Sequence, residues 1–289
     1  MLKKKHLKRI LYSILLLLFL AGCAKSTTAT PDNIIYLDTP FIPFIKKEWF
    51  NGIFVYPFAQ IINNLSPIIG VVSSIGLATV LVNLITFPLT IKSTASSQKI
   101  QEVQPELDKI KKKYEGLKDQ NSLLRQQQEI STLYKKNNIS IGSTFLGLFI
   151  TFPIMIAFLS VMRRTAAVLD GTFLGLPLKS SINEGFNLGK GNWLYFIIFI
   201  LMGVAQFISM MLPSYLAKRK LKKERKIKAY AQPEKQQDSQ QTMMYTMLGL
   251  ILLMSYSWPA AMSVYWFFSS FMNIIKTLYT TYLYKSKGA

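Results

Sequence analysis

Long apolar blocks separated by short basic stretches are the dominant pattern along the chain. The first block, 68–91, has twenty-four residues without a formal charge, which is enough for a helix to cross a hydrocarbon core of about 30 Å. Four further apolar blocks follow it. The pattern predicts an all-α polytopic membrane protein with five transmembrane helices, at residues 67–91, 141–162, 192–216, 241–257 and 260–284.

Two stretches between the blocks predict helices outside the membrane core. Residues 46–66 mix aromatic and charged side chains, which is typical of an outer interfacial helix. The alternative is a loop packed on the helix ends and broken at Pro57. Residues 92–140 carry apolar positions at spacings of three and four in two runs, with a turn at 115–119 between them. They predict a basic helical hairpin whose charged face serves either solvation or docking.

The first 22 residues have the layout of an export signal, with a basic start and a short apolar core. The following order, Leu20-Ala21-Gly22-Cys23, contains the only cysteine of the chain and resembles the lipobox of bacterial lipoproteins. That resemblance implies cleavage between Gly22 and Cys23, a lipid on the cysteine, and an extracellular tether at 23–45. An uncleaved anchor helix with an incidental cysteine is the alternative.

The uneven distribution of basic residues predicts the orientation in the membrane. The chain carries 34 Lys and Arg against 14 Asp and Glu, a net charge of +20. The stretches 92–140 and 217–240 hold ten and nine basic residues, whereas 24–66 and 163–191 hold three and four. Since basic loops stay on the cytoplasmic side, the N-terminus should lie outside and the tail, 285–289, inside. The excess charge suits anionic lipid or ribosomal RNA, and no DNA partner is expected.

The residue types available exclude several function classes. The chain has one Cys and one His, both near the N-terminus, and all of its acidic residues lie outside the apolar blocks. An intramembrane protease or a carboxylate-based proton carrier is therefore disfavoured. The sequence also lacks a Gly-rich phosphate-binding loop of the Walker type, which disfavours an ATP-driven pump. We expect no catalytic residue, cofactor or metal site.

Polar side chains share one face of several predicted spans, and we interpret them as the lining of a wet cavity open to the cytoplasm. Lys276 is the only ionisable group well inside a span. Lys276 and Asn83 each lie nine residues before the next basic residue, so they should sit at similar depth. Helix packing by the threonines and snorkelling by Lys276 are the alternatives. The candidate lining residues are Thr79, Asn83, Thr86, Thr144, Thr151, Gln206, Trp266, Asn273 and Lys276.

Three motifs appear in a specific order along the chain. They are Gln-Pro-Glu-Leu at 104–107 followed by Lys-Ile-Lys-Lys-Lys-Tyr at 109–114, Phe-Pro-Ile-Met-Ile-Ala-Phe at 152–158 running into Met-Arg-Arg-Thr at 162–165, and Trp-Pro-Ala-Ala at 258–261 followed by Tyr265 and Trp266. Together they resemble the hairpin, the second core helix and the last core helix of the YidC–Oxa family of membrane protein insertases. The lipoprotein signal and five spans resemble its Gram-positive members.

The resemblance implies a function in the bacterial cell membrane. Such proteins insert nascent membrane proteins, alone or beside the Sec translocon, without nucleotide hydrolysis. A groove open to cytoplasm and lipid receives the substrate helix, and a positive charge in it attracts acidic substrate residues. The hairpin would contact the substrate first, and basic cytoplasmic surfaces would favour the ribosome. The candidate lining residues would then form the substrate groove.

The chain departs from the family pattern at two places. The family usually has an Arg five residues before the Pro of its first core helix, where this chain has Asn83, and commonly has Gln where this chain has Lys276. We hypothesise that the charge has moved from the first helix to the fifth. The tail at 285–289 is short, so any ribosome contact should depend on 217–240.

Two other functions remain open on the sequence. A small-solute transporter is the main alternative, although five unequal spans without a visible repeat do not favour it. A pure folding chaperone for membrane proteins is the closer alternative, because the same fold suits both tasks.

Overall fold

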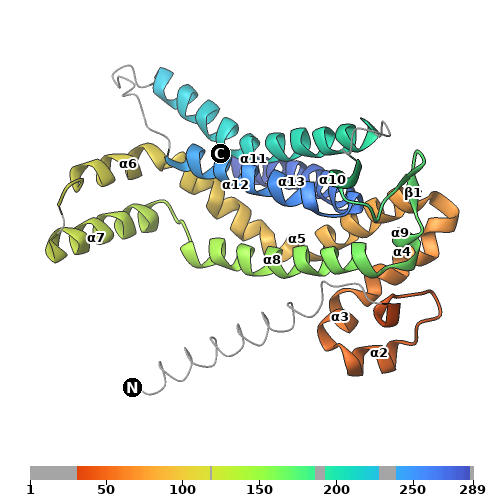
Figure 1. Ribbon diagram of the computed structural model, residues 1–289. Coiled ribbons are helices and arrows are strands. Elements are labelled where there is room, and N and C mark those ends of the chain that lie inside the picture. The colour runs from red at the N-terminus through yellow and green to blue at the C-terminus, as the bar shows by residue number, and fades with distance from the viewer. Residues whose placement is uncertain (1–30, 118, 186–192, 228–238, 287–289) are drawn as a thin grey trace. The chain divides into compact units, whose positions relative to one another are not determined.

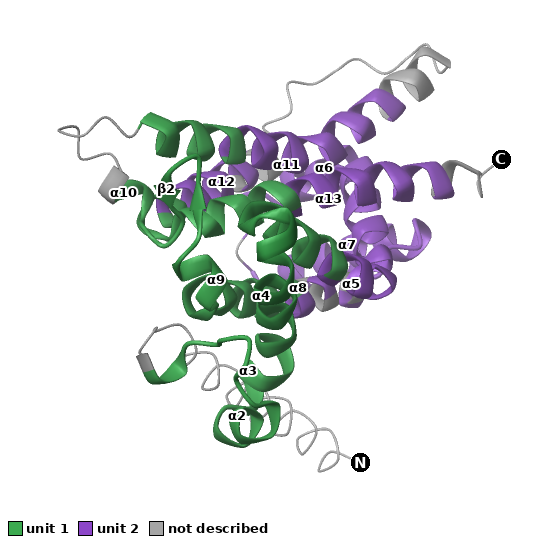
Figure 2. Cartoon of the chain, turned by 90° about the vertical axis from the view of Figure 1, so that its right-hand side faces the viewer, with its two compact units in different colours: residues 1–81, 151–202, 254–268 green, residues 82–150, 203–253, 269–289 purple. Residues whose placement is uncertain are grey.

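The computed structural model describes residues 31–117, 119–185, 193–227 and 239–286, and these are mostly helical (Figure 1). They group into two compact units, shown in Figure 2. Unit 1 comprises residues 1–81, 151–202 and 254–268, and unit 2 comprises 82–150, 203–253 and 269–289. The predicted signal peptide, with its cleavage site at Gly22 and Cys23, lies outside the described residues.

Five long helices contribute residues to both units. They are α5 (Val71–Glu102), α8 (Ile141–Arg164), α11 (Trp193–Ile227), α12 (Ser239–Ser257) and α13 (Ala260–Ser286). All five are longer than their predicted spans, and α5 and α11 exceed them most, because both continue as helix into the basic stretches that follow. Pro88 lies inside α5, where the hydroxyls of Thr86 and Thr90 donate to carbonyls one turn earlier in the same helix.

Some of these helices have the length and apolar composition of a membrane span. Among the described residues, Val71–Glu102 and Trp193–Lys220 are long and apolar enough to cross a bilayer, and Met244–Ser257 is a shorter apolar helix. Helix α11 also leaves a row of large apolar side chains exposed, which suits a lipid environment better than water. The row consists of Phe196, Ile197, Ile200, Leu201, Val204, Phe207 and Ile208.

Unit 1 begins with three short helices, α2 (Phe41–Lys47), α3 (Trp49–Phe54) and α4 (Tyr56–Ile69). They take the place of the single helix predicted at 46–66. Pro57 lies in the first turn of α4, where its missing N–H costs no helical hydrogen bond. Gly70, with φ of 80°, separates α4 from α5.

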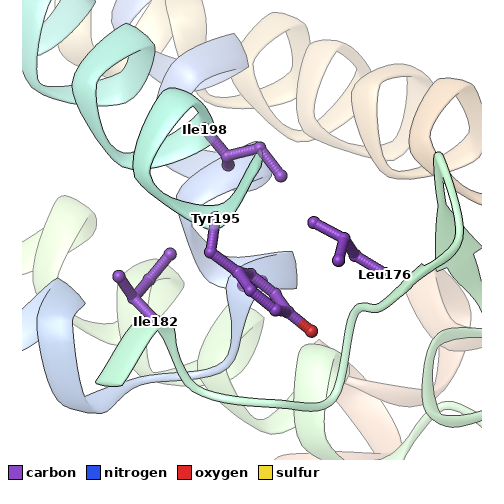
Figure 3. Packing of buried hydrophobic residues seen from close by; sticks show 5 residues of the cluster. Leu176, Ile182, Tyr195 and Ile198 are labelled. Carbon is purple, nitrogen blue, oxygen red and sulfur yellow. The ribbon is translucent and has the colours of Figure 1, made fainter. Parts of the chain in front are cut away.

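The described part of the stretch predicted as an outer loop, residues 163–185, forms short elements in unit 1. It contains α9 (Ala166–Leu169), the antiparallel pair β1 (Thr172–Phe173) and β2 (Leu176–Pro177), and α10 (Ile182–Gly185). Two residues of this stretch join a buried apolar cluster with residues of α11 and α13. Its members are Leu176, Ile182, Tyr195, Ile198 and Ala260, and Figure 3 labels the first four. The Tyr195 hydroxyl donates to the Pro177 carbonyl at 2.8 Å, so the polar tip of this buried ring is satisfied.

Unit 2 contains the helical hairpin, formed by α6 (Gln104–Lys113) and α7 (Gln120–Lys136). Their apolar faces meet in a cluster of Val103, Leu107, Leu133 and Ile139. Asp119 caps α7, because its carboxylate accepts the Ser122 backbone N–H at 2.9 Å. Hydrogen bonds from the Ser122 side chain and from its backbone N–H hold the pKa of Asp119 below its usual value. The apolar faces of α6 and α7 thus serve internal packing of the hairpin, and its charged residues face outward.

Candidate functional site

A buried lysine in unit 2 contacts an asparagine from a distant part of the sequence. Lys276 on α13 is only 8% exposed, and its Nζ donates to Asn83 Oδ1 on α5 at 2.6 Å. An amide oxygen accepts a hydrogen bond from the ammonium but does not neutralise its charge. The pair therefore keeps a positive charge inside the helical bundle of this unit.

A polar cavity of about 230 Å³ opens beside Lys276. Three helices of unit 2 form its wall, and none of the described lining residues is acidic. The lining consists of Ser93, Thr94, Ser97, Gln98 and Gln101 from α5, Ser209 and Pro213 from α11, and Asn273, Lys276 and Thr277 from α13. The arrangement can bind polar or negatively charged groups, and it offers no nucleophile–base pair for covalent chemistry.

Several polar groups of this wall bond to the protein itself. Gln98 Nε2 donates to the Thr277 carbonyl at 3.1 Å and to Thr281 Oγ1 at 3.3 Å, which ties α5 to α13. Thr94 Oγ1 donates to the Thr90 carbonyl at 3.1 Å. In contrast, Gln101 Oε1 is buried and has no partner among the described residues.

Helix α8 approaches the same wall closely within unit 2. A Cβ on Gly147 would fall 2.0 Å from Ser93 Oγ, so any larger residue there requires the Ser93 side chain to move. Helix α11 contacts α13 through a hydrogen bond: Gln206 Oε1 accepts from Ser270 Oγ at 2.6 Å. These two contacts fix the helices that surround the cavity residues.

The remaining predicted groove residues lie in other surroundings. Thr79 and Trp266 are buried in unit 1, where Trp266 stacks on Trp258 with ring centroids 5.2 Å apart, and Thr151 is exposed in the same unit. The hydroxyl of Thr79 donates to its own helix, as that of Thr86 does in unit 2. For these two threonines the structure has the alternative that the sequence left open, in which a threonine takes part in helix packing and does not line the cavity. The side chain of Thr144, in α8, lies outside those that the structure describes.

The sequence pattern does not identify the five cavity residues of α5. They all follow Lys92, and the predicted hairpin begins at residue 92; they are Ser93, Thr94, Ser97, Gln98 and Gln101. A signal was present, because uncharged polar residues recur at spacings of three and four between 90 and 101. They continue the polar face of the preceding helix for about three further turns.

Ion pairs on the hairpin show how its charges are arranged. Lys113 Nζ and the Tyr114 hydroxyl both donate to Glu129 Oε1, at 2.5 and 2.9 Å. Hydrogen bonds from these two groups lower the pKa of Glu129, and the bond to Glu129 raises the pKa of Lys113. The pair borders a wide surface cavity of about 700 Å³ between α6 and α7. Nearby, Lys220 on α11 pairs with Glu102 at 2.7 Å.

The chain is similar to known proteins over most of its length. The family model described as "60Kd inner membrane protein" matches residues 62–287. "Membrane protein insertase YidC 2" of Bacillus anthracis is 30% identical over 275 residues, which cover 94% of this chain and 91% of that protein. "Membrane protein insertase MisCA" of Bacillus subtilis is 29% identical, with coverage of 96% and 92%.

Proposed function

The chain belongs to the 60Kd inner membrane protein family, and from this membership we propose that it inserts other membrane proteins into the bacterial cell membrane. Its relatives are named membrane protein insertases, which supports this general activity. The resemblance noted from the 104–114, 152–165 and 258–266 motifs leads to the same family. Nascent membrane proteins are then the substrates, and membrane lipids are the surroundings.

The contact between Lys276 and Asn83 is the single observation that carries the proposed mechanism. Among the described residues this charge has no carboxylate partner in its cavity, and it lies on the part of the helices that we assign to the cytoplasmic side. A substrate segment with acidic residues gains electrostatic energy by entering such a site. Its apolar part then passes into lipid, and the cycle needs no nucleotide hydrolysis. Gln206 and Asn273 add polar groups to the same groove.

In this proposal the cation acts from α13 instead of from α5. The family pattern usually has Arg at the position of Asn83, and this chain instead brings Lys276 to within 2.6 Å of the Asn83 side chain. A charge so close to the usual position serves the same part of the groove. The contact to Asn83 also argues against simple snorkelling, because it holds the ammonium inside the bundle.

The membrane arrangement belongs to the same proposal. Five helices span the bilayer, with a lipid-anchored N-terminus outside and the C-terminus in the cytoplasm. The exposed basic residues Lys218, Arg219 and Lys220 extend α11 beyond its apolar part and favour binding to the ribosome. The hairpin contacts the substrate first, and the Sec translocon is a further partner.

Insertion into liposomes without ATP tests the proposal. The purified protein is reconstituted, a single-span test protein is added, and integration is scored by protease protection of its translocated tail. Protein-dependent integration supports an insertase. Integration equal to that of empty liposomes, with improved folding of the test protein, supports a chaperone instead. Solute flux without integration supports a transporter.

A further inference from the structure

One acceptor in the wall of the polar cavity lacks a donor. Gln101 lines the cavity that Lys276 also lines, and its Oε1 is buried without a partner in the described part of the chain. Buried polar atoms in folded proteins nearly always have a partner, from the protein, from water or from a ligand. The nearby amide of Gln98 is engaged with Thr277 and Thr281. Gln101 as a whole is only half-buried, so a rotation of its side chain can turn this unsatisfied acceptor toward an N–H group in the cavity.

Lys276 offers the complementary chemistry. Its ammonium has three N–H donors, and Asn83 Oδ1 accepts one of them. The cavity thus presents donors at Lys276 and an acceptor at Gln101. A carboxylate has acceptor oxygens only, so it suits Lys276 but brings two acceptors together at Gln101. A peptide group has one N–H and one C=O and suits both residues.

The size and wall of the cavity suit a stretch of polypeptide. Its volume of about 230 Å³ is below the roughly 300–1,000 Å³ of typical small-molecule sites. Nine of its ten described lining residues are polar, and Lys276 is the only charged one. Such a wall does not select a particular side chain. It provides hydrogen bonds for a backbone that has left water but has not yet formed a helix in lipid.

We propose that Gln101 and Lys276 together bind main-chain peptide groups of the substrate's hydrophilic segment. A substrate N–H donates to Gln101 Oε1, and a substrate C=O accepts from Lys276 Nζ. This inference rests on the proposed insertase function and specifies which part of the substrate the groove binds. It means that uncharged segments are bound as well, while acidic residues add attraction to Lys276 alone.

N-methylated substrates test this inference directly. A single-span test protein is prepared by chemical ligation with a short, uncharged Gly-Ser tail, or with the same tail N-methylated at each peptide nitrogen. The two tails have the same charge and the same side chains, but the second has no backbone N–H. The initial rate of insertion into liposomes is measured for each tail, and the rate with empty liposomes is subtracted.

The wild-type protein should insert the unmethylated tail about five-fold faster, which is the factor that one net hydrogen bond provides. In Gln101→Leu and Gln101→Met, the ratio of the two rates should fall to about one. The midpoint of thermal unfolding of each variant in detergent, compared with that of the wild type, serves as the control for folding.

Equal rates for the two tails in the wild-type protein overturn the inference without the need for any variant. A rate ratio that persists in both Gln101 variants overturns it as well. Either result still leaves protein-dependent insertion intact and so leaves the proposed function standing. The absence of protein-dependent insertion of both tails contradicts the proposed function itself.

Discussion

Arg164 Nη1 donates to Glu48 Oε2 at 2.6 Å, and the arginine is completely buried. Arg164 Nε also donates to the Asn33 carbonyl at 2.8 Å, and the Ile35 N–H donates to the Arg164 carbonyl at 2.6 Å. The end of α8 therefore holds the chain segment that precedes α3. This pair connects two parts of unit 1 that lie 116 residues apart in the sequence.

Removal of the Glu48 carboxylate should destabilise unit 1. Glu48→Ala leaves the guanidinium buried without its anionic partner, which typically costs about 3–5 kcal/mol. We expect a lower midpoint of thermal unfolding in detergent and faster proteolysis within residues 31–54. Glu106→Ala is the matched control, because Glu106 is exposed on α6, and its midpoint should stay near that of the wild type. Equal midpoints for the two variants contradict the importance of the Arg164 contact.

The same pair predicts a dependence of stability on pH. Partial burial raises the pKa of Glu48, but hydrogen bonds from Arg164 and Asn51 and the charge of Arg164 outweigh it, so the net pKa lies below the usual 4.5. A carboxylate with a depressed pKa in the folded state stabilises the protein above its unfolded pKa, and this stabilisation is lost as the pH falls through the folded value.

Thermal unfolding should accordingly show a loss of midpoint below about pH 4.5 that is smaller in Glu48→Gln. The glutamine variant still accepts a hydrogen bond from Arg164 but does not titrate. The difference between the wild type and this variant isolates the contribution of Glu48 from that of the other carboxylates. Parallel profiles for the two proteins down to pH 3 rule out the assigned role of Glu48.

Close packing in unit 2 predicts an effect at Gly147. Gly147→Ala places a methyl group against Ser93 Oγ and should lower the free energy of unfolding by about 1–3 kcal/mol. Ser93→Gly removes the side chain that the methyl group would meet, so the double variant should lose less than the sum of the two single variants. A double-mutant cycle measures this coupling, and strict additivity of the two effects refutes the contact.

Some of this structure follows from local sequence patterns. Counting residues from Asn83 to Lys92 and from Lys276 to Lys285 gave equal depths, and the structure brings Asn83 and Lys276 together. The turn at 115–119 follows from its Gly and Asp residues, and the structure has Gly116 at φ 85°. These features depend on short-range chemistry, which a single sequence contains.

Other features were not accessible from one sequence. The Gln101 position was missed because Lys92 resembles the end of a span, whereas α5 continues as helix to Glu102. The pairing of Ile35 with residues around Arg164 joins segments far apart in the chain, and no local pattern encodes it. The interfacial stretch was predicted as one helix because hydrophobic spacing does not report breaks at residues such as Glu48 and Val55.

In the proposed mechanism, Lys276 supplies the positive charge of the groove in place of a cation at residue 83. The most direct measurement is the insertion rate of a single-span substrate with an acidic tail, for wild type, Lys276→Gln, Lys276→Arg and the double variant Asn83→Arg with Lys276→Gln. We predict about a ten-fold loss with glutamine, corresponding to roughly 1.4 kcal/mol of lost attraction, and retained activity with arginine and with the double variant. Unchanged insertion with Lys276→Gln contradicts the account.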